Sequence, residues 1–288
     1  MSQNRVEQNP DLNNPDALRA AVAERYAEAV INVNDAAATT QQSCCSVSKL
    51  AGYDDAQLDG VPEQAVTSSF GCGNPVAFAG IEPGQTVLDL GSGAGIDLFL
   101  AAKAVGPTGR VIGVDMTDEM IARARANIAA SGAKNIEVRK GVIEKLPVEN
   151  GSVDWVISNC VINLSPEKPR VFSEIARVLA PGGQISISDI VVDELPEWAM
   201  RSFDLYCACL AGAISERDYL AGLEAAGLEA KVTDRLVYDA PQLAALVQEE
   251  LGGAEALEKM LADAGVSLTQ AAASIQGRVW SARFVGSK

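Results

Sequence analysis

The sequence predicts an α/β protein whose core is a doubly wound, mostly parallel sheet, followed by a smaller C-terminal α+β domain. Two observations support this prediction. Between residues 80 and 192, short apolar segments alternate with longer segments that have the periodicity of helices. A glycine-rich turn follows the first apolar segment, as in parallel sheets that bind a ligand at the carboxyl ends of their strands.

The core elements follow one another in regular order. Strands are expected over residues 86–91, 110–115, 136–141, 153–160 and 184–191. Helices are expected over residues 97–105, 117–132 and 165–183. Thr117 is a typical N-cap residue, and Gly132 is a typical C-terminal stop. Ser165 can cap the third helix, and the sequence Pro181-Gly182-Gly183 is expected to end it.

The segments on either side of the core are expected to be mainly helical. An apolar stripe predicts a helix over residues 14–30, formed by Leu18, Val22, Tyr26 and Val30. Small polar residues predict a mobile loop over residues 35–48. Later in the chain, helices are expected over 216–228 and 241–267, and strands over 229–240 and 277–286. We therefore divide the chain into an N-terminal region (1–63), a central domain (64–192) and a C-terminal domain (193–288).

Composition and charge restrict the possible functions. Of the 288 residues, 48% are hydrophobic, which is enough for a full-sized core. The net charge of −15 disfavours binding to nucleic acid or to an anionic membrane surface. No apolar run approaches the roughly 20 residues of a membrane-spanning helix, and the polar N-terminus lacks a signal-peptide core. We therefore expect a soluble cytoplasmic protein.

The residues available for catalysis are limited because the chain contains no histidine. Serine and cysteine mechanisms that use an imidazole base are therefore excluded. The six cysteines are Cys44, Cys45, Cys72, Cys160, Cys207 and Cys209. None of them forms a CxxC pair, so the spacing of a zinc ribbon is absent. In a reducing compartment the cysteines are expected to be thiols.

The glycine-rich turn has the sequence VLDLGSGAGID and contains Asp89, Gly91, Gly93 and Gly95. It departs from the dehydrogenase pattern GxGxxG, because the third glycine of that pattern would fall at Ile96. Asp115 ends the second strand, where a ribose diol needs a carboxylate acceptor. The third strand leads into Val142, Ile143 and Glu144, where an adenine would lie.

This order of features resembles the class I S-adenosylmethionine-dependent methyltransferases over roughly residues 64–192. The resemblance implies that S-adenosylmethionine is the cofactor and S-adenosylhomocysteine the product, with no tightly bound metal. The implied cofactor-binding residues are Asp89, Gly91, Gly93, Asp115, Met116, Ile143, Glu144 and Asn159. In this set Asp115 would hold the ribose, and Met116 would pack on the adenine.

Three cysteine-bearing segments are expected to converge at the mouth of this pocket. They are SSFGCGNP with Cys72, SNCVINL with Cys160, and YCACLAGA with Cys207 and Cys209. Thiolates bind soft, thiophilic centres. Taken singly, however, Cys160 and Cys207 are more typical of small buried hydrophobic residues. Cys72 is less so, because a loop flanked by glycines is a poor place to bury a side chain.

Together the three segments resemble the arsenite S-adenosylmethionine methyltransferases, from about residue 40 to the end of the chain. The resemblance implies that Cys72, Cys160 and Cys209 hold trivalent arsenic as three thiolates, with arsenite and methylated arsenicals as substrates. Cys209 matches the family better than Cys207, which is then either a spare ligand or a packing residue. The family also uses a cysteine near the N-terminus, and either Cys44 or Cys45 fills that place here.

The resemblance also implies a mechanism in which arsenic keeps a lone pair, attacks the methyl group and needs no general base. Methylation oxidises arsenic, and a cysteine pair can return two electrons by forming a disulfide. Cys72 and the N-terminal cysteine are the expected partners, with thioredoxin or glutathione as the reductant. An exposed Cys44–Cys45 pair without any role is an equally good interpretation of that loop.

Two other functions are compatible with parts of the sequence. The first is a methyltransferase for a small molecule, such as a quinone or lipid, in which the cysteines are only structural. The second is a thiolate metal sensor or store, which leaves the glycine-rich turn unexplained. Asp189, near the end of the fifth strand, is expected to be an ordinary strand-end acid.

Overall fold

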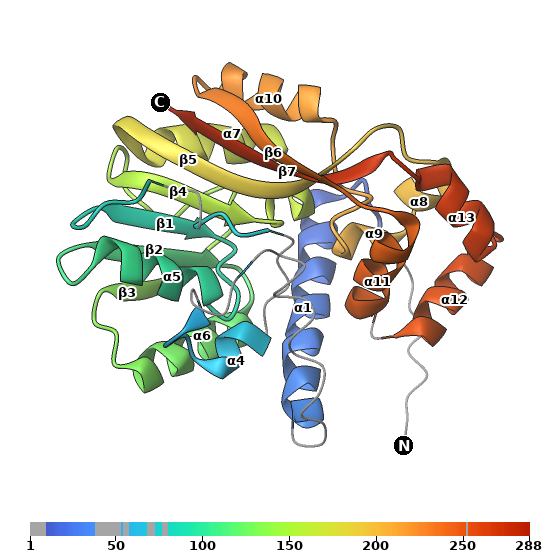
Figure 1. Ribbon diagram of the computed structural model, residues 1–288, viewed down its shortest axis with the longest axis horizontal. Coiled ribbons are helices and arrows are strands. Elements are labelled where there is room, and N and C mark those ends of the chain that lie inside the picture. Colours follow the sequence, from blue (N-terminus) through green and yellow to red (C-terminus); the bar gives the residue numbers. More distant parts are fainter. Residues whose placement is uncertain (1–9, 38–52, 54–57, 68–72, 77–79, 252) are drawn as a thin grey trace.

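A computed structural model of the chain describes residues 10–37, 53, 58–67, 73–76, 80–251 and 253–288. Its centre is a seven-stranded sheet with the strand order β3-β2-β1-β4-β5-β7-β6 (Figure 1). The strands are β1 (Thr86–Leu90), β2 (Arg110–Asp115), β3 (Ile136–Lys140), β4 (Val153–Asn159), β5 (Leu179–Val192), β6 (Glu229–Val237) and β7 (Val279–Ser287). Strands β1 to β5 are parallel, whereas β7 pairs antiparallel with both β5 and β6. The predicted mostly parallel sheet is confirmed.

Helices cover both faces of this sheet. The α5 (Ile96–Val105) and α6 (Asp118–Ser131) helices pack on one face, and α7 (Lys168–Val178) and α10 (Glu216–Ala225) pack on the other. Successive residues of β1 face opposite layers, since Val87 packs with α5 and α6, whereas Leu88 packs with α7 and α10. Both faces are thus buried, as expected for parallel strands. Two short elements are α4 (Glu63–Thr67) and the 3-10 helix η1 (Ile162–Leu164).

The helix after β4 is shorter than the sequence predicted. The α7 helix begins at Lys168 and ends at Val178, because Leu179 already pairs with Val153 of β4. Ser165 does not cap this helix, and its hydroxyl instead donates to Glu144. The Pro-Gly-Gly sequence lies inside β5, where the pairing with β4 changes register, so the strand accommodates it as an irregularity.

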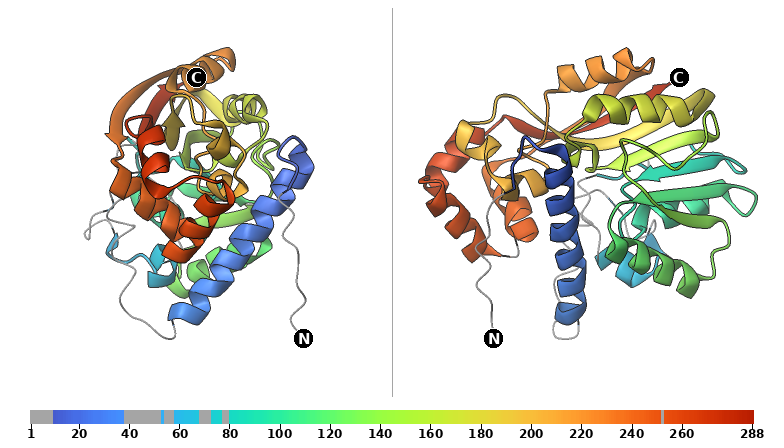
Figure 2. Two further views of the ribbon diagram at one scale, coloured as in Figure 1. Left: turned by 90° about the vertical axis from the view of Figure 1, so that its right-hand side faces the viewer. Right: turned by 180° about the vertical axis from the view of Figure 1, so that it is seen from behind.

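The C-terminal region shares the central sheet. The strands predicted over 229–240 and 277–286 are present as β6 and β7, and they extend the sheet beyond β5. A group of helices packs beyond the end of the sheet (Figures 1 and 2). These are α8 (Glu197–Met200), α9 (Phe203–Cys207), α11 (Ala240–Leu251), α12 (Ala254–Asp263) and α13 (Leu268–Ile275). The single helical region predicted over 241–267 is two helices, and α12 is preceded by Gly253 with a φ of 137°.

The α1 helix (Pro15–Ala37) is longer than predicted and crosses between the sheet and the C-terminal helices (Figure 2). On the sheet side, Arg19 Nη1 lies 3.2 Å from Glu144 Oε1. On the helical side, the Tyr26 hydroxyl donates to the backbone carbonyl of Cys207 at 3.0 Å. The helix therefore joins the two parts of the molecule. In the part of the chain that the structure describes, no helix is both long enough and apolar enough to cross a membrane.

Phe284 of β7 offers a test of this core. Its side chain is fully buried and stacks on Tyr219 of α10, with ring centroids 4.1 Å apart. We expect Phe284→Ala to lower the free energy of unfolding by about 3–5 kcal/mol, because the substitution leaves a cavity. Urea denaturation measures this loss. Val237→Ala, at an exposed position of β6, should change the same free energy by less than about 0.5 kcal/mol. Equal losses for the two variants would contradict this description of the core.

Candidate active site

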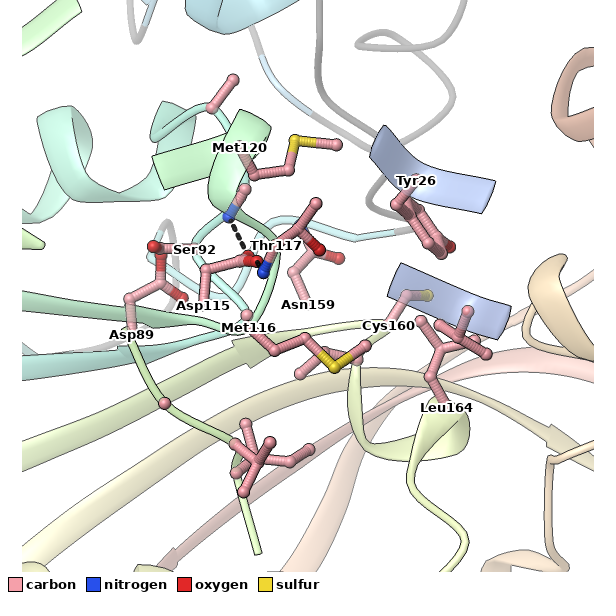
Figure 3. Close-up of a pocket in the computed structure, with 18 of the residues that line it drawn as sticks. Tyr26, Asp89, Ser92, Asp115, Met116, Thr117, Met120, Asn159, Cys160 and Leu164 are labelled. Carbon is pink, nitrogen blue, oxygen red and sulfur yellow. Dashed lines mark hydrogen bonds between the residues drawn. The ribbon is translucent and has the colours of Figure 1, made fainter. Parts of the chain in front are cut away.

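A cavity of about 120 Å³ lies at the carboxyl ends of β1, β2 and β4 (Figure 3). Every residue that the sequence predicted to bind the cofactor lines this cavity: Asp89, Gly91, Gly93, Asp115, Met116, Ile143, Glu144 and Asn159. Cys160 lines it as well. Tyr26, Cys160 and Leu164 lie on one side of the cavity, opposite Asp89 and Ser92 (Figure 3). The sheet thus brings together residues that are far apart in the sequence.

The glycine-rich turn forms one wall of the cavity. Gly91 and Gly93 have φ values of 63° and 51°, which favour glycine over other residues. A Cβ atom at Gly91 would overlap the side chain of Val161, whereas a Cβ atom at Gly93 would meet nothing within 4 Å. Gly93 therefore leaves its side of the cavity open to a ligand. The Gly93 amide donates to Asp115 Oδ2 at 2.9 Å, which ties the turn to the end of β2.

Three buried carboxyl groups line the cavity, and each is costly to ionise there. Burial raises the pKa of Asp89 well above its usual range, and the nearby Asp97 and Asp115 add to this effect. Burial raises the pKa of Asp97 to about 6, although hydrogen bonds from Tyr53 and Asn159 oppose the change. Burial also raises the pKa of Asp115, against hydrogen bonds from the Thr117 and Gly93 amides. A cationic ligand would stabilise all three carboxylates.

The N-terminal helix contributes a wall that the sequence analysis missed. Arg19, Val22 and Tyr26 of α1 line the cavity. Tyr26 was interpreted only as part of the apolar stripe, since periodicity shows which face is buried but not what covers it. Glu144, predicted to lie at the adenine, also accepts a hydrogen bond from Ser165 at 2.6 Å. Further residues line the cavity that the sequence did not assign to the cofactor site: Asp97, Thr117, Met120, Leu164 and Ser165.

Cys160 and Cys209 lie together although 49 residues separate them in the chain. The Cys209 Sγ donates to the backbone carbonyl oxygen of Cys160 at 2.8 Å. Both residues have left-handed backbones, with φ values of 58° and 60°, a conformation unfavourable for a residue with a side chain. Only one other residue outside glycine, Glu194, has a positive φ in the described part of the chain. Such strain persists only where the surrounding structure imposes it.

The cysteines differ in their bonding. Cys160 is disulfide-bonded. Cys207 and Cys209 carry thiol groups and are buried. The remaining cysteines predicted for the site, Cys44, Cys45 and Cys72, lie outside the described residues. Over the ranges that are described, no three Cys, Asp or Glu residues are grouped so that they could hold a metal ion.

A buried network of hydrogen bonds contacts the backbone of Cys209. Asn163 Nδ2 lies 2.8 Å from Asp189 Oδ1 and 3.3 Å from the carbonyl oxygen of Cys209. The Lys168 ammonium donates to the carbonyl of Asn163, and the Tyr219 hydroxyl donates to Asp189. Burial raises the pKa of Asp189 to about 7 and lowers the pKa of Lys168 to about 8. Asp189 is therefore not the ordinary strand-end acid that the sequence suggested.

Comparison with known proteins connects this geometry to a family. The methyltransferase domain family matches residues 81–234. The crystal structure of an arsenic (III) S-adenosylmethionine methyltransferase from Chlamydomonas reinhardtii is 36% identical, covers 80% of this chain and 71% of that chain, and superposes with a TM-score of 0.62. The chain belongs to the arsenite S-adenosylmethionine methyltransferase family. Its core has the Rossmann-like fold of class I methyltransferases.

Two curated arsenite methyltransferases are also similar to this family member. The protein from Halobacterium salinarum is 47% identical over 229 residues, which are 75% of this chain and 58% of that protein. The protein from Aquipseudomonas alcaligenes is 35% identical over 210 residues, which are 70% of this chain and 59% of that protein. The chain therefore spans somewhat less than two thirds of the length of these two relatives.

The buried Asp97 predicts how stability depends on pH. Its pKa rises from 3.8 to about 6 on folding, so the folded protein holds this proton more tightly than the unfolded chain. The stabilising effect of protonation is complete below about pH 4 and is lost as the pH rises through about 6. We expect this loss to be about 3 kcal/mol, because one pKa unit corresponds to about 1.4 kcal/mol.

Urea denaturation of the ligand-free protein between pH 4 and pH 7 tests this effect. The free energy of unfolding of Asp97→Asn should fall less steeply with pH than that of the wild type. Asp118→Asn, at an exposed position of α6, serves as the matched control and should keep the wild-type slope. Parallel curves for the wild type and Asp97→Asn would contradict the raised pKa.

Proposed function

We propose that this protein transfers methyl groups from S-adenosylmethionine to trivalent arsenic, supplied as arsenite or methylarsenite and held by cysteine thiolates. One observation carries this proposal. Cys160 lines the cavity at the carboxyl edge of the sheet, and the Cys209 thiol lies against the Cys160 backbone. A cysteine that lines a cofactor cavity, with a second cysteine thiol against its backbone, is suited to an acceptor that binds sulfur. The proposed reaction would serve arsenic detoxification.

The cavity has the chemistry that S-adenosylmethionine requires. When bound, this molecule supplies a methyl group on a sulfonium centre, and it also carries an ammonium group. Asp89 and Asp97 are buried carboxyl groups that line the cavity. In the described part of the chain, no cationic side chain contributes to the pKa shift of either group. Asp115 lies at the end of β2, where its carboxylate can accept from ribose hydroxyls. The open space beside Gly93 leaves room for the ligand.

The thiolates would convert arsenite into a nucleophile of defined position. Two or three Cys sulfurs displace its hydroxyl groups, because arsenic is a soft centre that prefers thiolate ligands. Arsenic keeps its lone pair in this pyramidal form. The lone pair then forms the bond to the methyl carbon as the carbon–sulfur bond of the donor breaks. Cys160 and Cys209 would position the acceptor for this attack. No histidine base is needed, because the attacking arsenic has no proton to lose.

The methylation step oxidises arsenic from the trivalent to the pentavalent state. Two electrons are needed to restore the trivalent state, and two cysteine thiolates supply them when they form a disulfide. Cys72 with Cys44 or Cys45 is our proposed pair for this step. The disulfide bond of Cys160, which lines the cavity, supports disulfide chemistry at this site. Thioredoxin or glutathione would return the disulfide to thiols.

Cysteine substitutions test the assignment of the ligands. We expect Cys160→Ser and Cys209→Ser each to lower arsenite methylation at least 100-fold, because a hydroxyl is a poor ligand for a soft ion. The affinity for S-adenosylmethionine should change less than threefold. Mass spectrometry of methylated arsenic and S-adenosylhomocysteine, with a phosphine reductant present, measures the reaction.

Cys207→Ser is the matched control, since it makes the same change two residues from Cys209. If Cys207 is a packing residue, this variant keeps most of the activity. Retention of activity by both Cys160→Ser and Cys209→Ser would overturn the thiolate site. Failure of the wild type to methylate either arsenite or methylarsenite would overturn the proposed function itself.

The disulfide at Cys160 predicts a redox requirement. A sulfur in a disulfide cannot act as a thiolate ligand, so the disulfide of Cys160 must be reduced before Cys160 can bind arsenic. We expect arsenite to bind at least tenfold more tightly after treatment with a phosphine reductant than before it. Equilibrium dialysis with arsenic quantification measures the difference. Equal binding by the oxidised and reduced protein would show that Cys160 is not a ligand.

A further inference from the structure

The side chain of Asn159 makes two hydrogen bonds with a single residue of a distant segment. Asn159 Oδ1 accepts from the Gly73 amide at 3.1 Å. Asn159 Nδ2 donates to the Gly73 carbonyl at 2.7 Å. The carboxamide therefore pairs with both backbone groups of Gly73, as a neighbouring strand would. Asn159 ends β4, so this contact fixes Gly73 at the carboxyl edge of the sheet.

The other side of Gly73 is closed by β5. A Cβ atom at Gly73 would overlap the Cβ of Ser188 and lie only 2.7 Å from its Oγ. Ser188 pairs in register with Asn159, so Gly73 is confined between two neighbouring strand ends. Two residues after Gly73, the carbonyl of Pro75 accepts a hydrogen bond from the Ser186 hydroxyl of β5 at 2.7 Å. Residues 73–75 thus lie against the sheet. Only a residue without a side chain fits at position 73.

Asn159 is also connected to the cofactor cavity and to Tyr53. Its Nδ2 donates to the Tyr53 hydroxyl at 2.9 Å and lies 3.2 Å from Asp97 Oδ2. The Tyr53 hydroxyl in turn donates to Asp97 Oδ1 at 2.8 Å. Tyr53 is buried, and Asn159 and Asp97 line the cavity. We call these four residues, Asn159, Gly73, Tyr53 and Asp97, the Asn159 network.

Two residues of the Asn159 network are direct chain neighbours of proposed arsenic ligands. Gly73 directly follows Cys72, and Asn159 directly precedes Cys160. Consecutive Cα atoms are only about 3.8 Å apart. The hydrogen bonds between Gly73 and Asn159 therefore hold together the chain positions next to these two cysteines, of which Cys72 lies outside the described residues.

We propose that Asn159 is a positioning residue: its carboxamide fixes Gly73 to the end of β4 and thereby sets the relative position of the two chain segments that carry the proposed arsenic ligands Cys72 and Cys160. This inference rests on the proposed function, because it assumes that both cysteines are arsenic ligands. It assigns Asn159 a role beyond cofactor binding. It also gives Gly73, which contacts neither ligand in our proposal, a defined effect on arsenic affinity.

A steric substitution and its relief test the position of Gly73. Gly73→Ala should lower arsenite affinity at least tenfold, because the new methyl group displaces the segment from Ser188. The affinity for S-adenosylmethionine should stay within twofold, since Gly73 does not line the cavity. Ser188→Gly in the same chain removes the overlapping atoms and should restore arsenite affinity to within threefold of the wild type.

The rescue is specific because the buried Ser188 hydroxyl has no hydrogen-bond partner among the described residues. Ser188→Gly alone should therefore bind arsenite as the wild type does. Equilibrium dialysis of reduced protein measures arsenite binding, and calorimetry measures cofactor binding. Loss of both affinities in Gly73→Ala, or failure of Ser188→Gly to restore the first, would overturn the positioning role.

A second pair of variants tests the carboxamide directly. Asn159→Asp keeps the shape and the acceptor for the Gly73 amide but removes the donor to the Gly73 carbonyl. We expect its arsenite affinity to fall at least tenfold, whereas Tyr53→Phe, which loses one outer contact of the network, should show a smaller loss. Asn135→Asp makes the same chemical change at the Gly106 carbonyl, away from the site, and is the control.

The outcomes separate the two levels of the proposal. Wild-type affinity in Asn159→Asp, with an active wild-type enzyme, would overturn the inference and leave the proposed function intact. If the reduced wild type neither binds nor methylates arsenite, the proposed function fails first. Equal losses in Asn159→Asp and Asn135→Asp would show a general structural effect and would also overturn the inference.

Discussion

The parallel pairing of β1 with β2 on one side and β4 on the other is the constraint on which the site depends. Parallel strands end at the same edge of a sheet, so Asp115 at the end of β2 and Asn159 at the end of β4 flank the turn that follows β1. This arrangement brings the glycine-rich turn, the acids and Cys160 to one cavity. The helices on both faces keep this edge in place because they bury almost every residue of the strands.

Convergence at one edge also concentrates negative charge where water is excluded. Asp89, Asp97 and Asp115 are all nearly inaccessible to solvent. Each ionised carboxylate there lacks most of its hydration, and their mutual repulsion adds to the cost. A folded chain retains such an arrangement at the expense of stability, which is typical of binding sites. The ligand-free protein thus holds an electrostatic field that favours a cation before any ligand arrives.

The sequence predicted the parts of the site that depend on local spacing. Strand periodicity, the glycine-rich turn and the acid that ends the second strand were sufficient to identify the lining residues of the sheet edge, from Asp89 to Asn159. These features survive in the sequence because each belongs to one strand and the turn after it. The wall formed by α1 was missed, since nothing in the apolar stripe of Tyr26 distinguishes a cofactor cavity from an ordinary core.

The conformations of Cys160 and Cys209 could not be predicted for a different reason. A glycine in the sequence can indicate a left-handed backbone, whereas a cysteine does not. Cys160 and Cys209 adopt this conformation only because the tertiary structure imposes it. The buried position of Asp189 is likewise tertiary, because its partners Asn163 and Tyr219 come from separate segments. The early end of α7 followed from pairing between Leu179 and Val153, which outweighed the helix signals around it.

The corner after β4 links the two halves of the proposed reaction. Val161 fills the space beside Gly91, so it contacts the turn that lines the cofactor cavity. Cys160 lies against the Cys209 thiol, and Asn163 reaches the carbonyl of Cys209. Residues 159–163 therefore contact the donor side and the acceptor side within five consecutive positions. Because close-packed groups move together rather than independently, we expect a shift of the glycine-rich turn to displace the thiols through this corner. In the proposed reaction, the relative position of donor and acceptor would thus depend on this one short segment.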